Sequence, residues 1–416
     1  MTKDRLSPRA LNRATLARQL LLDRSALTPA QAITHLAGLQ AQAPLAPYVG
    51  LWARLAAFRP QQLENLMNER AVLRAHLMRH TVHLVDARDF LRFRPLFQPL
   101  LSQALRGNLA RRLDGVDLAE LRAEAASLLA QAPLTRTALA RALAPRWPDH
   151  DPGLLANAAA QSLVLVQIPP RGLWSQTGPA VWALASAWLE SHPAAASPES
   201  HPTAASPENQ PAAASPESHP VASPSLPVTK IPLATTTPPT PAGLAGAADE
   251  LVLRYLSAYG PATVADVQAW SGLTRLREVT ERLGTRLRPR TGPGGAPLLD
   301  LADAPPDPDP GIPAPPRFLP EYDNLLLSYA ERSRVIPHRR PVPLPPGNGA
   351  SVGTLLVDGC WQADWRLGQE PGVLEVRPYI PLSVADRDAI AAEGERLLGF
   401  VRPADTRDVR FVRDGE

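Results

Sequence analysis

A repeat of about nine residues is the feature of this 416-residue chain that most restricts its fold. Between His192 and Pro227 the sequence reads HPAAASPES, HPTAASPEN, QPAAASPES and HPVASPS. Alanine, serine, proline and glutamate supply no large side chains for a core, and this period is far shorter than that of a solenoid unit. The sequence therefore predicts a disordered linker over residues 192–241, which divides the chain into two halves.

The N-terminal half predicts helices followed by a β-hairpin, twice. In residues 1–114, leucines at helical spacing and the cap pair Thr28-Pro29 precede the apolar, β-branched stretch AVLRAHLMRHTVHLV. In residues 115–191, two helices lead into a third, which runs into two strands joined by a Pro-Pro-Arg-Gly turn. Three helices followed by a hairpin are typical of a winged helix, so we predict one such module in each range.

The same plan recurs after the linker. Residues 242–303 contain GPATVADVQAWSGL, which predicts a helix-turn-helix, and RLRPRTGPGGAPLLDL, which predicts a wing with a glycine-rich tip. Residues 304–416 are mixed, with a two-residue hairpin signal at Asp358-Gly359 and a closing helix capped by Ser383. The expected fold class is α+β and mainly helical: tandem winged-helix modules with a small C-terminal β-containing part.

The composition limits the possible classes of function. No run reaches the ~18 apolar residues of a membrane span, and the first residues lack the apolar core of a secretion signal. Cys360 is the only cysteine, which excludes an intramolecular disulfide, favours a reducing cytoplasm and argues against a zinc cluster. We therefore expect a cytoplasmic protein that binds neither a membrane nor a metal or organic cofactor.

The positive charge is carried almost entirely by arginine. The net charge is +3, and lysine occurs only at positions 3 and 230. Arginine suits phosphates and base edges, although an Ala-, Pro- and Arg-rich composition also follows from a GC-rich genome. Repeated winged helices make double-stranded DNA the expected partner, with a scaffold or protein-docking role as the alternative. Several dissimilar modules in one chain favour a monomer that wraps one duplex over a dimeric regulator.

Two neutral amides, Gln40 and Gln42, interrupt the apolar stretch HLAGLQAQAPLAPYVGLWARL. The helix that begins at Pro29 is expected to run to about Leu39 and to stop near Gln40, because Pro44 biases the preceding residue away from helix. At such a break both amides can turn towards one point and hold a water molecule without adding charge. Alternatively, they satisfy the free backbone groups of the helix end.

The segment GLQAQAPLAPYVGLWARL resembles the catalytic segment of the winged-helix DNA glycosylases of the AlkZ type. That family carries a Gln-aliphatic-Gln motif, and its YcaQ-like branch has Asp in place of the second Gln. The resemblance continues through LMRHTVHLV, IPPRGLW, FLPEYDNLLLSYAERSRVI and TLLVDGCWQADWRL, and so covers almost the whole chain outside the linker. The chain departs from the pattern at His80, where a small residue such as glycine is expected, and in its repeat linker.

The resemblance implies a monofunctional DNA glycosylase of base excision repair, associated with the nucleoid, that releases N7-alkylated purines and unhooks interstrand cross-links. Gln40 and Gln42 would then be the catalytic residues. An N7-alkylated purine is already cationic and leaves without being protonated, so a positioned water suffices. No lysine lies in a motif to form a Schiff base. The competing class is a DNA-binding regulator or nucleoid protein without catalysis.

Further residues are expected beside the site or on DNA phosphates. The family places the strand of Arg79 and His83 beside the site, although a structural role for His83 is equally open. Arg171 lies in a predicted wing turn, and Arg332 and Arg334 lie in a basic stretch, where each is either a phosphate contact or an ordinary surface arginine. The expected DNA-binding residues are therefore Arg79, His83, Arg171, Arg332 and Arg334.

Overall fold

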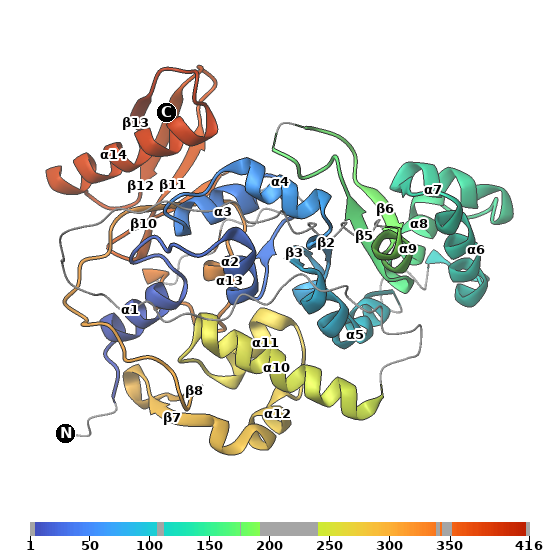
Figure 1. Ribbon diagram of the computed structural model, residues 1–416, viewed down its shortest axis with the longest axis horizontal. Coiled ribbons are helices and arrows are strands. Elements are labelled where there is room, and N and C mark those ends of the chain that lie inside the picture. Colours follow the sequence, from blue (N-terminus) through green and yellow to red (C-terminus); the bar gives the residue numbers. More distant parts are fainter. Residues whose placement is uncertain are drawn as a thin grey trace, which may run out of the picture.

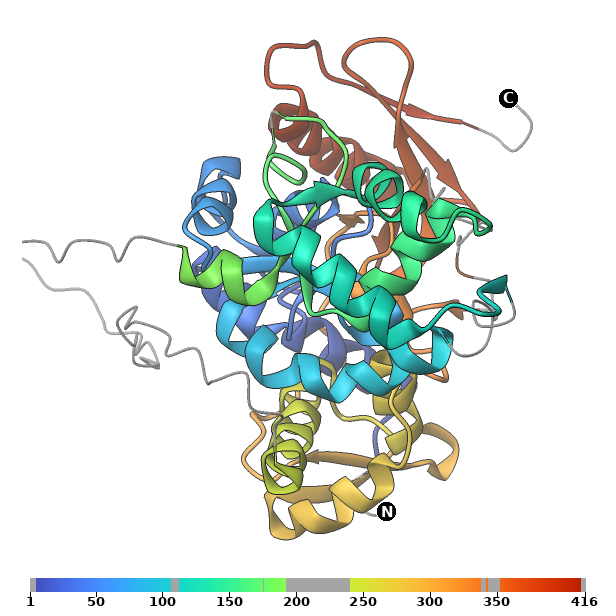
Figure 2. The same cartoon turned by 90° about the vertical axis from the view of Figure 1, so that its right-hand side faces the viewer.

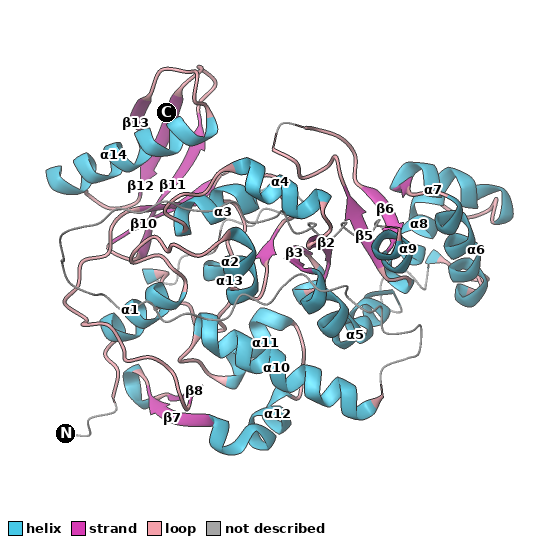
Figure 3. Ribbon diagram, viewed as in Figure 1, coloured by secondary structure: helices cyan, strands magenta, loops and turns pink. Residues whose placement is uncertain are grey.

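The computed structural model describes residues 5–105, 112–174, 176–191, 240–337, 342 and 352–412. Residues 192–239, which make up nearly all of the predicted linker, lie outside the described residues. The chain forms a mixed α+β fold in which helices predominate (Figure 3).

One order of elements occurs three times along the chain: a helix, a short strand, two helices and a hairpin. In each case the short strand pairs with the second strand of the hairpin. This is the winged-helix plan predicted from the sequence. In the first module the elements are α2 (Pro29–His35), β1 (Leu39–Gln40), α3 (Ala46–Arg54), α4 (Pro60–Asn68), β2 (Val72–His76) and β3 (Val82–Asp86).

The second and third modules follow the same order. The second comprises α6 (Leu118–Gln131), β4 (Leu134–Thr135), α7 (Arg136–Leu143), α8 (Pro152–Ser162), β5 (Leu165–Ile168) and β6 (Val181–Leu184). The third comprises α10 (Pro241–Tyr259), α11 (Val264–Ser271), α12 (Leu276–Leu283), β7 (Leu287–Thr291) and β8 (Pro297–Leu301). In the third module the short strand is reduced to one bridge, between Ala262 and Leu299.

Threonine caps begin a helix in each of these modules. Thr28 accepts a hydrogen bond from the backbone of Gln31, Thr135 from that of Ala138, and Thr263 from that of Asp266. Each cap satisfies a backbone N–H that the first turn leaves without an intrahelical partner.

The helix that begins after Thr28 is shorter than predicted, because α2 ends at His35. Ala37 and Gly38 then adopt left-handed φ angles of 54° and 97°, and the N–H of Gly38 donates to the carbonyl of Ile33. A glycine at such a φ is a common helix stop. Gln40 therefore ends a strand and does not lie at a helix end, which corrects the prediction.

The first two modules share one sheet. Its six strands have the order β1-β3-β2-β5-β6-β4, so the two hairpins lie back to back with β2 antiparallel to β5. The register partners at the junction are Arg74 and Gln167. Figure 1 shows this sheet between the helices of the two modules.

The C-terminal part is a five-stranded sheet with one long helix, in the order β13-β12-β11-β10-β9. Asp358 and Gly359 form the predicted turn between β10 and β11, both with positive φ, and Ser383 caps the closing helix as predicted. The elements are β9 (Arg317–Leu319), α13 (Asn324–Leu327), β10 (Gly353–Val357), β11 (Cys360–Leu367), β12 (Val373–Pro378), α14 (Val384–Val401) and β13 (Asp408–Phe411).

Three further helices connect these parts: α1 (Pro8–Arg18), α5 (Ala87–Ala104) and α9 (Ala185–Glu190). The first module lies between the C-terminal sheet and the third module in both views (Figures 1 and 2). One buried cluster joins all three, with Trp270 of the third module and Trp361 of the C-terminal sheet almost fully buried in it. Among the helices that the structure describes, none is long and apolar enough to cross a membrane.

Candidate active site

The two glutamines lie side by side at the end of β1. Gln40 ends β1 in register with His83 of β3, and the N–H of Ala41 donates to the carbonyl of Val82. Residues two apart on a strand point to the same side. The Nε2 of Gln40 accordingly donates to the Oε1 of Gln42 at 3.3 Å. Both amides do meet at one point, as expected from the sequence, but strand pairing brings them there.

The two amides differ in exposure. Gln40 is buried, with 6% of its surface exposed, whereas Gln42 is half-buried and lines a cleft. Gln42 is thus the member of the pair that is accessible from the cleft.

Arg74 of β2 fixes the backbone between the glutamines. Its guanidinium donates to the carbonyl of Ala41 at 2.9 Å and to the Oε1 of Gln167 at 3.4 Å. Burial and, to a smaller extent, the charge of Arg171 lower the pKa of Arg74 to about 10. A buried cation that donates to a carbonyl makes a strong hydrogen bond, so the peptide that carries Gln42 is held in place.

Arg79 supports Gln40 from the turn between β2 and β3. Its guanidinium donates to the Oε1 of Gln40 at 2.8 Å, to the Oδ1 of Asn324 at 3.2 Å and to the carbonyl of Trp270 at 2.5 Å. Burial lowers the pKa of Arg79 to about 10. Because these acceptors come from the first module, the third module and α13, Arg79 locks the amide of Gln40 to three parts of the fold.

Asn324 and His83 complete the surroundings of the pair. The Nδ2 of Asn324 donates to the carbonyl of Gly38, just before β1, at 3.2 Å. His83 is fully buried and its Nδ1 donates to the carbonyl of Thr81 at 3.1 Å. Burial and the neighbouring Arg79 lower the pKa of His83 to about 3, so its imidazole is neutral at physiological pH. His83 therefore lies beside the site, as the sequence suggested, but without access to a ligand.

The cleft that Gln42 lines has a volume of about 490 Å³ and lies over the β2–β5 junction. One wall comes from the first module and is mostly neutral: it includes Gln42, His76, His80 and Thr81. The other wall comes from the second module and includes Thr135, Arg136, Thr137 and Arg171. No member of the lining set carries a carboxylate. The cleft therefore offers amide, imidazole, hydroxyl and guanidinium groups to a ligand.

His80 occupies a backbone conformation that accounts for its departure from the expected small residue. Residues Met78–His80 form the single-turn 3-10 helix η1, in which Arg79 and His80 have left-handed φ angles of 53° and 60°. Glycine adopts this conformation without strain, and histidine is among the few other residues that are enriched there.

The remaining predicted DNA contacts fall into two groups. Arg171 lines the cleft and donates to the carbonyl of Gly178 at 2.7 Å. Arg332 is half-buried, donates to the carbonyl of Tyr329 at 3.1 Å and lowers the pKa of nearby Arg79. Both side chains are half-buried and are candidate phosphate ligands.

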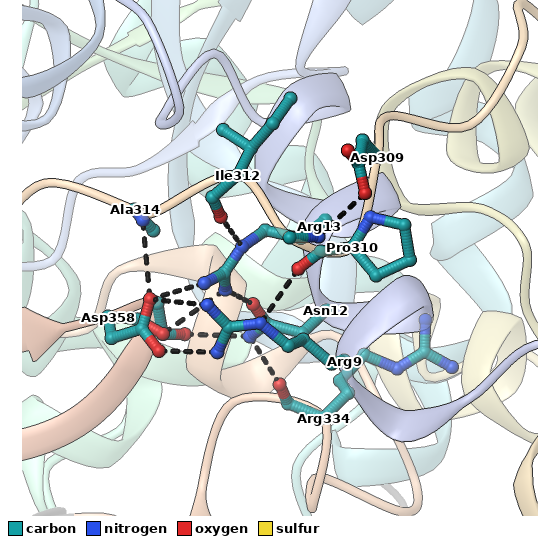
Figure 4. Close-up of polar contacts among 11 residues, drawn as sticks. Arg9, Asn12, Arg13, Asp309, Pro310, Ile312, Ala314, Arg334 and Asp358 are labelled. Carbon is teal, nitrogen blue, oxygen red and sulfur yellow. Dashed lines mark hydrogen bonds and ion pairs between the residues drawn. The ribbon is translucent and has the colours of Figure 1, made fainter.

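Arg334 does not belong with them. It is buried, and its guanidinium donates to the carbonyl of Pro261 at 2.9 Å and lies 3.6 Å from the carboxylate of Asp266. Its own carbonyl accepts from Asn12, in the polar cluster that fastens α1 to the Asp358 turn (Figure 4). The prediction of Arg334 as a phosphate contact is therefore wrong, because its guanidinium is buried and interacts with groups inside the fold.

No metal centre is evident in the part of the chain that the structure describes, since no three His, Cys, Asp or Glu side chains there are placed to share an ion.

A family model described as DNA glycosylase AlkZ-like matches residues 33–400. The chain belongs to the AlkZ-like DNA glycosylase family. Its fold is similar to the solved structure of the Streptomyces sahachiroi DNA glycosylase AlkZ, with a TM-score of 0.67 and 18% sequence identity. That match covers 98% of this chain and 100% of the other. No curated protein matches the chain.

Family membership implies that this AlkZ-like chain binds DNA. It also directs attention to residues that sequence reasoning missed. These residues are Arg74 and His76, within the predicted strands, and Arg136 and Asn324, none of which the sequence marked as a site residue. Arg74 donates to the backbone of Ala41, 33 positions away, and Asn324 donates to the backbone of Gly38, 286 positions away. No local signal marks such partners.

Proposed function

We propose that this chain is a monofunctional DNA glycosylase that hydrolyses the N-glycosidic bond of N7-alkylated purines and also unhooks cross-linked purines. The observation that carries the proposal is the pair of neutral amides, fixed by Arg74 and Arg79 at the edge of a cleft whose lining has no carboxylate. Such a site suits a leaving group that needs no acid.

The chemistry of the substrate explains why a site without a general acid is sufficient for hydrolysis. A water oxygen forms a bond to C1′ of the deoxyribose while the C1′–N9 bond breaks. The bonding pair moves onto the purine and cancels its positive charge, so the base leaves neutral. The proton that the water loses passes to solvent. Glycoside hydrolysis ordinarily employs a carboxylic acid to protonate the leaving group, and a cationic base removes that requirement.

Gln42 acts on the attacking water in this proposal, and Gln40 is its positioning residue. An amide oxygen has two lone pairs and can accept from Gln40 and from a water at the same time. Because Arg79 orients the amide of Gln40, the hydrogen bond at 3.3 Å also orients the amide of Gln42. Holding a reactant in the reactive geometry accelerates a reaction.

The two walls of the cleft suggest how DNA lies in it. Arg136 and Arg171 of the second module suit phosphates, whereas the neutral wall with Gln42 suits the deoxyribose and base. A target nucleotide that is rotated out of the duplex would thus have its phosphates on one wall and its glycosidic bond by the other.

Base release tests the function directly. We expect abasic sites to form when the purified protein is incubated with duplex DNA that carries N7-methylguanine, in any sequence context. A duplex with a cross-link between N7 atoms of two purines should yield separated strands as well. Sequence-specific protection in a footprint, with no abasic sites at enzyme excess, would instead support the DNA-binding regulator.

DNA affinity should depend strongly on salt and little on sequence. Replacing Arg171 or Arg332 by alanine should weaken binding to every duplex and reduce the slope of log affinity against log salt by about one unit each, because each change removes one phosphate contact. Binding titrations at several salt concentrations measure the slope. Arg410→Ala is the matched control, since Arg410 is paired with Glu370 and Asp408 on β13 and should leave the slope unchanged. A loss confined to one sequence would contradict this assignment.

A further inference from the structure

His80 places an imidazole in the cleft beside Gln42, at a position where the backbone favours glycine. Its φ is 60°, its side chain is half-buried, and both residues line the same cavity. The neighbouring turn is fixed, because Arg79 is held by three acceptors and the α11 end packs on it: a Cβ at Gly272 would lie 3.3 Å from Arg79. The imidazole is therefore held at a defined place in the wall.

His80 and its neighbour His76 form a pair of imidazoles with ring centroids 5.6 Å apart. Burial lowers the pKa of both: that of His76 falls to about 4, and that of His80 falls below its usual 6.5. Arg94 of α5 also lowers both pKa values; it is buried, and its guanidinium donates to the carbonyl of Leu163. Both imidazoles are thus neutral at neutral pH.

The other charged groups around the pair are cations or already engaged. Arg74 lies on β2 with His76, and Arg136 and Arg171 lie across the cleft on the second module. The acidic residue of α11, Asp266, is 3.6 Å from the guanidinium of Arg334. In the described part of the chain, no ion pair links a carboxylate to either imidazole. Protonation of His80 would therefore add a positive charge to a wall that faces other positive charges.

We infer that His80 is a specificity-determining residue that contacts the departing base and selects bases that carry the positive charge themselves. The inference rests on the proposed function and adds the group that reads the charge of the substrate. A neutral imidazole offers one nitrogen that accepts an N–H of the purine and a ring face that tolerates a cation. An imidazolium offers neither and repels a cationic base.

The pH dependence of release follows from this assignment. Because the pKa of His80 lies below 6.5, the imidazole is neutral above that pH and becomes protonated as the pH falls further. We expect release of N7-methylguanine to be constant from about pH 7 to about pH 8 and to fall as the pH is lowered through the pKa of His80. Single-turnover release at saturating enzyme measures the chemical step at each pH.

Two substitutions separate titration from structure. His80→Asn keeps a neutral hydrogen-bonding group that tolerates a left-handed φ but cannot be protonated in this range. Its rate of base release at pH 7.5 should be within about threefold of the wild-type rate, and this rate should not fall at acid pH. His80→Gly suits the backbone conformation. Its rate of base release at neutral pH should be about fivefold lower than that of the wild type, as expected for the loss of one hydrogen bond, and should not change with pH. His150→Gln, on the second module away from the cleft, should match the wild type.

The outcomes are distinguishable. A wild-type protein that releases no base at any pH contradicts the proposed function itself. If the wild-type protein is active but its profile is flat, or if His80→Asn keeps the acid fall, the assignment of His80 is wrong while the function stands. Thermal unfolding of each variant at pH 5 and pH 7.5 shows whether a fall in rate comes from loss of fold.

Discussion

Replacing Gln42 by alanine should lower single-turnover release of N7-methylguanine by roughly ten- to thousand-fold, by analogy with the loss of one positioned transition-state hydrogen bond. Gln42 lines the cleft and is half-buried, and its removal takes one hydrogen-bond acceptor away from the Nε2 of Gln40. DNA affinity and the free energy of unfolding should change little. Gln61→Ala, an exposed glutamine on α4, is the matched control and should leave release unchanged.

Gln40→Ala should impair release too, because Gln40 links Arg79 to Gln42. The double change should cost less than the product of the two single effects, since both residues act on one water. Unlike Gln42, Gln40 is buried and accepts from a buried guanidinium, so its loss should also cost about 1 kcal/mol or more of stability. Undiminished release by folded Gln40→Ala/Gln42→Ala protein would exclude the catalytic assignment.

The largest expected effect on stability lies at Asp323. Its carboxylate accepts two hydrogen bonds of 2.9 Å from Arg54 and a third from the backbone of Leu325, and both side chains of the ion pair are at most 3% exposed. Asp323→Ala leaves the Arg54 charge buried without its partner, which costs about 3–5 kcal/mol. Denaturant unfolding measures the change.

The surface pair of Asp249 and Arg282 provides the comparison for that result. Its side chains are 23% and 44% exposed. Asp249→Ala should therefore cost about 0–1 kcal/mol, because solvent screens an exposed pair. Similar losses from the two substitutions would mean that burial of the Arg54–Asp323 pair has little energetic weight.

Local signals in the sequence predicted much of the fold. The caps at Thr28 and Ser383 and the turn at Asp358-Gly359 occur where predicted, since each depends on residues within one turn of the backbone. The sequence also indicated that winged-helix modules recur. The strand β1 was missed because it has only two residues, Leu39 and Gln40, and exists through its pairing with β3 more than forty positions later.

The sequence predicted the pair of glutamines in the site, but it did not predict which residues surround them. The unusual pair of amides in an apolar segment marked Gln40 and Gln42, whose catalytic roles remain predictions. Sequence alone could not separate Arg332, which is half-buried at the site, from Arg334, which is buried against Asp266. These two arginines are two positions apart, and only tertiary packing decides which of them faces solvent.

The pairing of β2 with β5 has a consequence for the energetics of damage recognition. Because the pairing of β2 with β5 and the hydrogen bond from Arg74 to Gln167 join the two walls of the cleft, opening the cleft would require breaking the sheet. The elastic work of fitting duplex to protein therefore falls on the DNA. Duplexes differ in how easily they kink and unstack, and damaged or mispaired steps deform at lower cost. A rigid protein would thus bind preferentially to easily deformed sites in DNA, before the glycosidic bond is broken.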